Sequence, residues 1–193
     1  MHEQGAWLVF EDEAGQSLRP PKARTWAPRG RTPVVKVTGK GYGRVSLAGL
    51  ICTRPGQRTR LMFRTLLRRG RAGEVKGFGP CQFAGLLDAA HAQLGGRIVL
   101  VWDNDRRHLS KAMRTYIQAR SAWLTVFQLP AYAPELNPVE QVWSALKRGL
   151  ANLAPRDTDQ LAAVVKTKLK RMQYRHGLLD GFTAATGLTL DPP

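Results

Sequence analysis

Residues 97–105, RIVLVWDND, decide the fold class of this chain. A continuous apolar run rich in β-branched residues is typical of a strand buried on both faces of a sheet. The segments around it alternate between helical and strand-like patterns. The predicted helices span 79–96, 110–120, 138–151 and 157–174, and the next strand spans 123–130. Strands that alternate with helices in this way indicate an α/β domain.

The first third of the chain adds strands rather than helices. An apolar strand is predicted at 7–13, and a hairpin is predicted from 34–37 and 44–52 around a glycine-rich turn. Residues 60–68 fit either an edge strand or a short helix. Residues 17–33 are rich in Pro, Arg and Gly and exclude a regular core element. The predicted fold is therefore α/β, with a mixed central sheet flanked by helices.

The composition points to a polyanionic partner. The chain has 193 residues, 30 Lys and Arg, 14 Asp and Glu, and a formal net charge of +16. Such an excess favours nucleic acid, and no apolar run approaches the length of a spanning helix, so no membrane partner is expected. We expect one domain, residues 1–193, with a core over about 7–151 and a basic C-terminal helix over about 157–175. Cys52 and Cys81 have no metal-binding spacing and are expected to be buried.

Three acidic residues follow predicted strands or open a predicted helix: Asp12, Asp103 and Glu140. In open α/β sheets, functional groups gather where strands end. If the strands at 7–13 and 97–105 are neighbours, Asp12 and Asp103 repel each other unless a cation lies between them. Oxygen ligands suit Mg²⁺, and two such ions can activate an attacking water and stabilise the leaving oxygen of a phosphodiester.

Each of these residues also has a simpler structural explanation. Asp12 fits a solvated strand end, and Glu140 fits the preference of acidic residues for the first turn of a helix. Asp105 shares a face with Asp103 if the strand extends that far, and is an alternative ligand. Asn137 is the predicted N-cap, with Pro138 at the first helical position, an arrangement that orients Glu140.

Four blocks of the sequence resemble the transposases of bacterial insertion sequences related to the mariner superfamily. The last block is the most specific, close to a family pattern L-P-x-Y-S-P-x-L-N-P-I-E-x-x-W, with Ala133 and Val139 as mild departures. The interval between Asp103 and Glu140 also fits that family. The blocks are EDEAG (11–15), TWAPRGRTP (25–33), VWDNDRRH (101–108) and LPAYAPELNPVEQVWSALK (129–147).

The resemblance implies a ribonuclease-H-like fold and metal-dependent cutting and joining of transposon DNA ends. By position, Asp12, Asp103 and Glu140 match the catalytic and metal-binding acidic triad. It implies Mg²⁺ or Mn²⁺, with two ions, and a homodimer acting on transposon-end and target DNA in the bacterial cytoplasm, at the nucleoid. Related full-length enzymes carry an N-terminal helix-turn-helix module, and we expect that module to be absent from this sequence.

Other matched positions receive supporting or DNA-binding roles. Supporting roles are expected for Asn104, His108 and Asn137. DNA contacts are expected for Trp26, Arg29, Arg31, Lys147 and Arg148, where the loop around Trp26 contacts DNA or a partner subunit. The basic run 166–175 is either a solvated helix face or a DNA-contact face.

Two other functions remain open at this point. The same fold serves nucleases that act on RNA–DNA hybrids or junctions, and such a nuclease would not join strands. A non-catalytic, DNA-binding remnant of a transposon would bind DNA without regard to the three carboxylates or to Mg²⁺.

Overall fold

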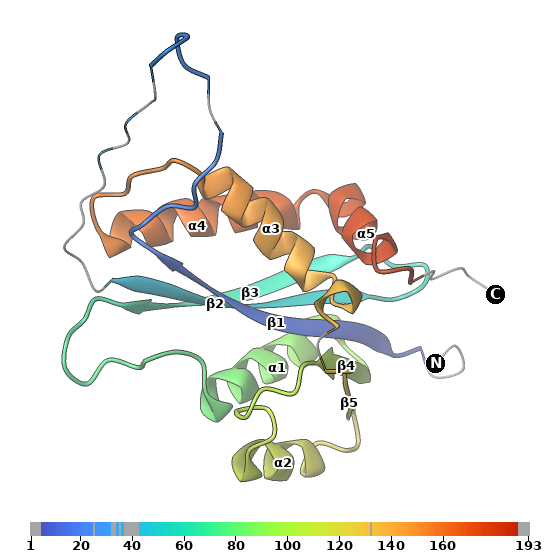
Figure 1. Cartoon of the computed structure of the whole chain (residues 1–193). Helices are drawn as coiled ribbons and strands as arrows, with labels where there is room; N and C mark the ends of the chain where they lie inside the picture. The colour runs from blue at the N-terminus through green and yellow to red at the C-terminus, as the bar shows by residue number, and fades with distance from the viewer. Residues whose placement is uncertain are drawn as a thin grey trace.

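The structure is a computed structural model that describes residues 5–24, 26–31, 34, 36, 43–131 and 133–188. Within these residues the chain forms a mixed sheet covered by helices on both faces (Figure 1). The predicted fold class is therefore confirmed. No helix in this part of the chain is long and apolar enough to cross a membrane.

The sheet has the strand order β3-β2-β1-β4-β5. Its strands are β1 (Trp7–Ser17), β2 (Arg44–Thr53), β3 (Arg60–Arg68), β4 (Ile98–Trp102) and β5 (Leu124–Gln128). The first three strands pair antiparallel, whereas β4 runs parallel to both β1 and β5. The segment at 60–68 is thus an edge strand and not a helix.

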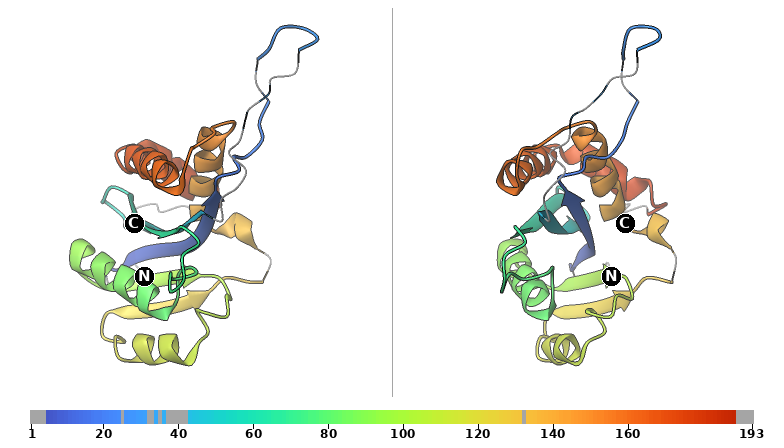
Figure 2. Two further views of the ribbon diagram at one scale, coloured as in Figure 1. Left: turned by 90° about the vertical axis from the view of Figure 1, so that its left-hand side faces the viewer. Right: turned by 60° about the vertical axis from the view of Figure 1, so that its left-hand side comes forward.

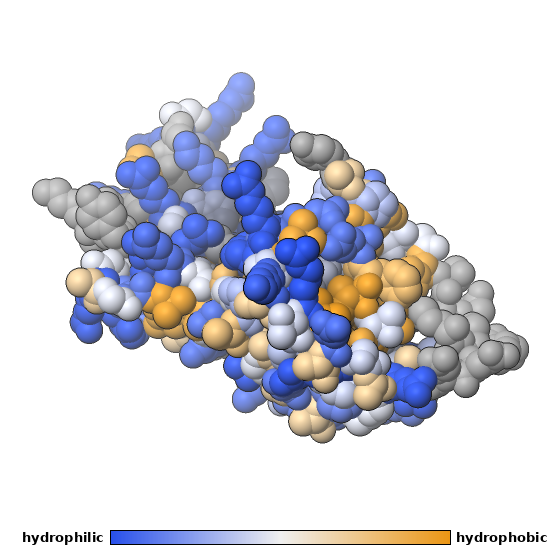
Figure 3. Space-filling view, turned by 90° about the horizontal axis from the view of Figure 1, so that it is seen from below, coloured by the Kyte–Doolittle hydropathy of each residue, from blue (hydrophilic) through white to orange (hydrophobic). Residues whose placement is uncertain are grey.

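Two helical layers enclose the sheet. The helices are α1 (Pro80–Leu94), α2 (Lys111–Gln118), α3 (Val139–Leu150), α4 (Thr158–Gln173) and α5 (His176–Ala184), with a short 3₁₀ turn, η2, at Pro134–Leu136. Helices α3, α4 and α5 lie on one face, and α1 and α2 lie on the other (Figure 1). The side with α2 presents mostly hydrophilic side chains, interrupted by small hydrophobic patches (Figure 3).

Strand β1 separates two hydrophobic clusters. Its even-numbered residues Leu8 and Phe10 pack in the cluster under α3 and α4. Its odd-numbered residues Trp7 and Val9 pack in the cluster over α1. Strand side chains alternate between faces, so this pattern decides toward which layer each acidic residue at 11–13 points. Strand β1 runs on to Ser17, so Asp12 lies in the middle of a strand and not, as predicted, at the end of one.

Several sequence-based boundaries need correction. Strand β4 ends at Trp102, so residues 103–105 form a loop. Of the predicted strand 34–37 only Val34 and Lys36 are described, and neither is in a strand; the rest of that segment lies outside the described residues. Helix α5 was not predicted. Cys52 is buried as expected, but Cys81 is exposed in the first turn of α1.

The segment after β1 leaves the body of the domain. Residues 19–24 and 26–31 project beyond α3 and α4 (Figure 2). The base of this segment is tied to the loop after α3, where the Asn152 side chain exchanges hydrogen bonds with the backbone of Ala23. Farther out, the side chain of Trp26 is fully exposed. We call residues 19–24 and 26–31 the arm.

One glycine makes room for the contact between the sheet and α3. Gly49 on β2 pairs with Asp12 on β1. A Cβ atom at position 49 would lie 2.9 Å from the ring of Trp143 and 3.3 Å from Val139. Both neighbours are fully buried core residues, so neither has room to move.

We therefore expect Gly49→Ala to destabilise the fold by about 1–3 kcal/mol, because it forces the Trp143 ring out of its site. Chemical denaturation followed by circular dichroism measures the change. The matched control is Gly181→Ala in α5, where nothing lies within 4 Å of the added Cβ. Alanine there should stabilise the helix by up to about 1 kcal/mol. Equal effects of the two substitutions would contradict this packing argument.

Candidate active site

Asp12 lies on the face of β1 that points toward α3. The indole Nε1 of Trp143 donates a hydrogen bond to Asp12 Oδ2 over 2.9 Å. The pKa of Asp12 is raised from 3.8 to about 7. Burial is the largest cause, the negative charge of Glu140 comes next, and the charge of Asp103 has a smaller effect. The carboxyl group is thus held in a place where negative charge is unfavourable unless a cation compensates it.

Asp103 reaches the same end of the sheet from β4. Phe10 pairs with Val101 across the parallel strands, so Asp12 and Asp103 lie equally far beyond this pair. Asp103 Oδ1 accepts hydrogen bonds from the Asp105 backbone and from His108 Nδ1, each over 2.9 Å. The hydrogen bond from His108 holds the pKa of Asp103 below its usual value. Asp103 therefore stays ionised at neutral pH.

Glu140 is placed by the start of α3. The helix begins at Val139, one residue later than predicted, with Pro138 before it. The N-cap position is therefore Pro138 and not, as predicted, Asn137, but Asn137 Oδ1 still accepts a hydrogen bond from the Val139 backbone over 3.1 Å. Its Nδ2 donates to the backbone oxygen of Glu11 over 2.8 Å. This pair of bonds ties the first turn of α3, and with it Glu140, to strand β1.

The three predicted carboxylates line one pocket of about 420 Å³. Its wall consists of the middle of β1, the loops after β4 and β5, the turn η2 and the first turn of α3. The lining residues are Asp12, Asp103, Asn104, Asp105, Leu129, Pro130, Ala131, Ala133, Pro134, Asn137 and Glu140. Asn104 donates a hydrogen bond to the Leu129 backbone over 2.9 Å, which joins the loop after β4 to the end of β5.

A second hollow, of about 410 Å³, adjoins this pocket and shares Asp12, Asp103 and Asp105 with it. It also contains three cationic side chains, those of Arg44, Lys76 and Arg107. Together the two hollows place a row of carboxylates next to basic groups. Such a surface suits nucleic acid: the cations can hold the phosphate backbone, and the carboxylates can coordinate a metal ion next to it.

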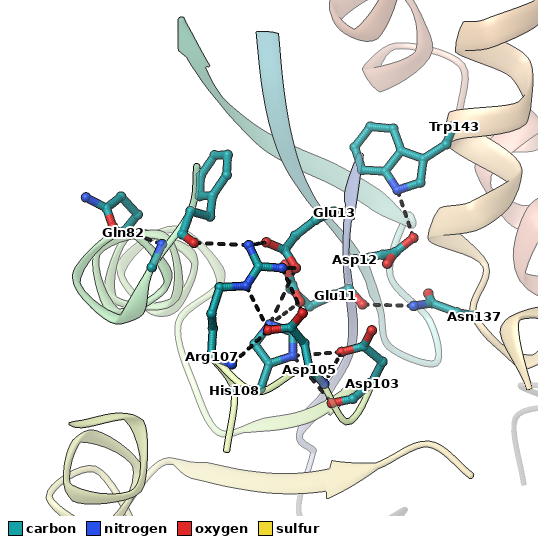
Figure 4. A network of polar contacts seen from close by, with 12 residues as sticks. Glu11, Asp12, Glu13, Gln82, Asp103, Asp105, Arg107, His108, Asn137 and Trp143 are labelled. Atoms are coloured by element: carbon teal, nitrogen blue, oxygen red, sulfur yellow. Dashed lines mark hydrogen bonds and ion pairs between the residues drawn. The ribbon is translucent and has the colours of Figure 1, made fainter. Parts of the chain in front are cut away.

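Sequence reasoning missed the charged network behind the pocket (Figure 4). Arg107 binds Glu13 through contacts of 2.8 and 3.0 Å and binds Asp105 over 2.7 Å. The hydrogen bond from Arg107 lowers the pKa of Asp105 to about 2, whereas burial raises the pKa of Glu13 to about 7. Asp105 is thus engaged by Arg107 rather than free as a ligand. The only sequence signal was the acidic triplet at 11–13, where β1 stops being apolar.

His108 is more central than its position in a loop suggested. Its side chain is 1% exposed, and its two ring nitrogens face Asp103 and Glu11. Among the described residues, one group of three metal-binding side chains meets within 4.8 Å: Glu11, Glu13 and His108. Asp12, Asp103 and Glu140 are not gathered that closely, although they share the pocket.

The donor set of the pocket fits a hard divalent cation. Asp12, Asp103 and Glu140 offer carboxylate oxygens, the ligands that Mg²⁺ and Mn²⁺ prefer. Burial, and after it the charge of Glu140, raises the pKa of Asp12, and a cation bound there would offset both effects. Glu11, Glu13 and His108 fit less well, because Arg107 already contacts both oxygens of Glu13.

The predicted DNA-binding residues lie away from the pocket wall. Trp26, Arg29 and Arg31 are exposed on the arm, and Lys147 and Arg148 are exposed near the end of α3. The arm projects past α3 and α4 (Figures 1 and 2). The structure thus separates these residues from the carboxylates.

Comparison with known proteins defines the class. Residues 7–162 match the model of the DDE superfamily endonucleases, and the chain belongs to this family. The chain is 28% identical over 100 residues to the transposase of the transposable element Tc1 from Caenorhabditis elegans. It is 30% identical over 81 residues to that of Tcb1 from Caenorhabditis briggsae. The matches cover 51% and 42% of this chain but only 36% and 29% of the two relatives.

Solved structures of the mariner transposase Mos1 share the fold. The paired-end complex with Mg aligns with a TM-score of 0.61 at 14% identity, covering 95% of this chain and 56% of that one. The isolated Mos1 catalytic domain aligns with a TM-score of 0.51 at 13% identity, covering 95% of this chain and 84% of that one. The predicted ribonuclease-H-like fold and the relation to mariner transposases are confirmed.

The raised pKa of Asp12 predicts a pH-dependent stability. The folded chain binds this proton more tightly than the unfolded chain, so stability is highest below about pH 4 for this group and falls as the pH rises toward 7. We expect Asp12→Asn to raise stability at pH 8 by about 1–2 kcal/mol and to weaken the pH dependence. Thermal unfolding in EDTA between pH 5 and 8 measures both effects.

Asp88→Asn is the control, since Asp88 is paired with Arg120 over 2.8 Å. This substitution should lower the unfolding temperature at pH 8. An Asp12→Asn protein that is less stable than the wild type at pH 8 would contradict the unfavourable charge assigned to Asp12.

Proposed function

We propose that this chain is the catalytic domain of a transposase that cuts DNA at transposon ends and joins the freed ends to target DNA. One observation carries the proposal: three carboxylates from β1, the loop after β4 and the start of α3 line one pocket in a member of the DDE endonucleases. The transposase relatives, and the likeness of the fold to Mos1 in its paired-end and strand transfer complexes, support the choice of substrate.

Asp12, Asp103 and Glu140 would hold one or two Mg²⁺ or Mn²⁺ ions. The bound ions would supply Lewis-acid activation of the attacking oxygen and stabilisation of the leaving oxygen. Asp103 is ionised and oriented by His108, and Trp143 fixes one oxygen of Asp12. Asn137 secures the helix turn that carries Glu140. The chain's own contribution is thus to fix three ligands that would otherwise repel one another.

The DNA substrate would be held by basic groups on two sides of the pocket. Arg44 and Lys76 lie in the adjoining hollow, next to Asp12 and Asp103. Lys147 and Arg148 extend the basic surface along α3, and the arm offers Arg29, Arg31 and the exposed Trp26. A projecting arm with an exposed aromatic ring suits contact with DNA or with the second subunit of a homodimer. Because its substrate is element and target DNA, we place the enzyme at the nucleoid of a bacterial cell that carries an insertion sequence.

The central test is nicking of supercoiled plasmid with Mg²⁺ or Mn²⁺. Wild-type protein should nick, and Asp103→Asn or Glu140→Gln should lower the rate by at least about a thousandfold, because a lost ligand removes transition-state stabilisation worth several kcal/mol. Glu135→Gln is the matched control, since Glu135 is exposed in η2 and does not line the pocket. It should nick at the wild-type rate.

An active Asp103→Asn protein would contradict the assignment of the site. Nicking without joining of transposon-end oligonucleotides would favour a nuclease of another substrate. DNA binding without nicking, insensitive to Mg²⁺ and to all three substitutions, would favour a non-catalytic remnant.

The basic end of α3 generates a separate prediction. Replacing Lys147 and Arg148 together by alanine should reduce the slope of log K against log salt concentration by about 1–2, since each lost phosphate contact releases about one counterion fewer. Fluorescence anisotropy with a duplex oligonucleotide at several salt concentrations measures the slope. Arg120→Ala is the control, because Arg120 is paired with Asp88, and its slope should match the wild type. An unchanged slope in the double variant would remove α3 from the DNA-binding surface.

A further inference from the structure

His108 lies between two carboxylates that come from neighbouring strands. Its Nδ1 is 2.9 Å from Asp103 Oδ1, in the loop after β4. Its Nε2 is 3.3 Å from Oε2 of Glu11, on β1. The side chains of His108 and Glu11 are each 1% exposed, so water does not compete for either contact. One imidazole ring therefore connects a ligand of the pocket to a buried carboxylate behind it (Figure 4).

Aromatic packing holds the imidazole in place. The ring stacks on Trp102 with centroids 4.2 Å apart and an angle of 5° between the planes. The ring of Phe83 approaches it edge-on at 4.7 Å and 68°. Both aromatic residues are fully buried in the cluster over α1. Because the imidazole cannot tilt or rotate freely between these rings, a contact that fixes one ring nitrogen also fixes the position of the other.

Glu11 has no structural role that explains its side chain. Neither of its carboxylate oxygens, nor Nε2 of His108, has a well-directed hydrogen bond within the described part of the chain. A buried carboxylate with so few partners is costly. On its own face of β1, Trp7 and Val9 before it are apolar core residues, and Glu13 after it is bound by Arg107. The position would accept an apolar side chain if only folding mattered.

The backbone of the same residue supports the third carboxylate. The carbonyl oxygen of Glu11 accepts the hydrogen bond from Asn137 that ties down the first turn of α3. Residue 11 therefore contacts the supports of both Asp103 and Glu140, while Asp12 follows it in the chain. Strand alternation makes this possible, since Glu11 and Asp12 point to opposite faces of one strand.

We propose that Glu11 is a positioning residue of the active site: through His108 it holds Asp103 in the orientation that binds the metal ion. The proposal rests on the proposed function, because it assigns Asp103 as a ligand. Asp103 Oδ1 is occupied by His108 and by the Asp105 backbone, which leaves Oδ2 for the ion. Partners behind a metal ligand commonly contribute 10–100-fold to metal affinity.

A cation bound by Glu11, Glu13 and His108 is the competing explanation of the same atoms. Their ligand atoms lie within 4.8 Å of one another. Arg107, however, already contacts both oxygens of Glu13. A cation would then have Glu11 and His108 alone as free ligands, fewer than a stable site needs. The contacts of His108 with Glu11 and Asp103, which we call the relay, account for these atoms without a further ion.

The test compares Glu11→Leu, which removes the carboxylate beside His108 Nε2 but keeps an apolar filling, with Glu11→Gln, which retains an oxygen there. Mn²⁺ binding is titrated by electron paramagnetic resonance, and stability is measured by thermal unfolding. We expect Glu11→Leu to weaken Mn²⁺ binding by about 10–100-fold and to leave the unfolding temperature at or above the wild-type value. Glu11→Gln should restore binding to within about threefold of the wild type.

Gln16→Leu is the matched control, because Gln16 is a buried polar residue of the same strand outside the pocket. Its Mn²⁺ affinity should equal that of the wild type. A double-mutant cycle with His108→Phe, which keeps the aromatic packing, should be non-additive: Glu11→Leu adds no further loss once His108 is replaced. Wild-type affinity in Glu11→Leu, or full additivity with His108→Phe, would overturn the proposal.

The ring nitrogens of His108 give a readout that does not depend on metal binding. In ¹⁵N-labelled protein, the Nε2 resonance should move in both Glu11 variants and stay unchanged in Gln16→Leu. If the wild type neither binds Mn²⁺ nor nicks DNA, the proposed function fails, and this resonance alone decides whether Glu11 engages His108. Mn²⁺ that remains bound in Asp12→Asn and Asp103→Asn but is lost in Glu11→Leu would overturn the relay in favour of a cation site behind the pocket.

Discussion

Repulsion between carboxylates in the middle of β1 is the constraint on which the rest of the site depends. Glu11, Asp12 and Glu13 follow one another there, and Asp103 and Asp105 lie in the loop after the neighbouring strand β4. Left alone, these charges would push the strand ends apart. The fold distributes them on two faces of the sheet. On the face toward α1, Arg107 binds Glu13 and the ring of His108 lies beside Glu11. Asp12 points to the opposite face, toward α3, and lines the pocket.

The different partners on the two faces explain why the pKa values of Asp103 and Asp12 are shifted in opposite directions. Asp103 is kept ionised by a hydrogen bond from His108, whereas burial and the charge of Glu140 raise the pKa of Asp12 to about 7. Under the proposed function, Asp103 would meet a cation already ionised, and Asp12 would be stabilised as a carboxylate only when the cation binds. Metal binding would then be linked to the release of a proton.

Helix α3 contributes Glu140 to the site, and close packing of the helix against the sheet brings Trp143 to Asp12. Gly49 on β2 leaves space for the ring of Trp143, and that ring brings its Nε1 within 2.9 Å of Asp12. Two turns of one helix thus serve the pocket, since Glu140 lies in the first and Trp143 follows it. The position of Trp143 thus depends on the absence of a side chain at Gly49, although β2 contributes no residue to the pocket of the three carboxylates.

The sequence alone determined the fold class, the buried strand that leads to the second aspartate, the helices α1 to α4 and, with the family resemblance, the three carboxylates that line the pocket. Periodicity, β-branched runs and the asparagine–proline start of α3 are local signals, and they survive in the structure with small shifts of boundary. The tertiary structure alone decided which residues stand behind the ligands. Glu11, Glu13 and Arg107 acquire their roles from the pairing of β1 with β4 and from the path of the loop after β4, which bring together groups far apart in the chain. No local pattern encodes that proximity, because it arises only when the parallel strands align and the loop folds back over α1.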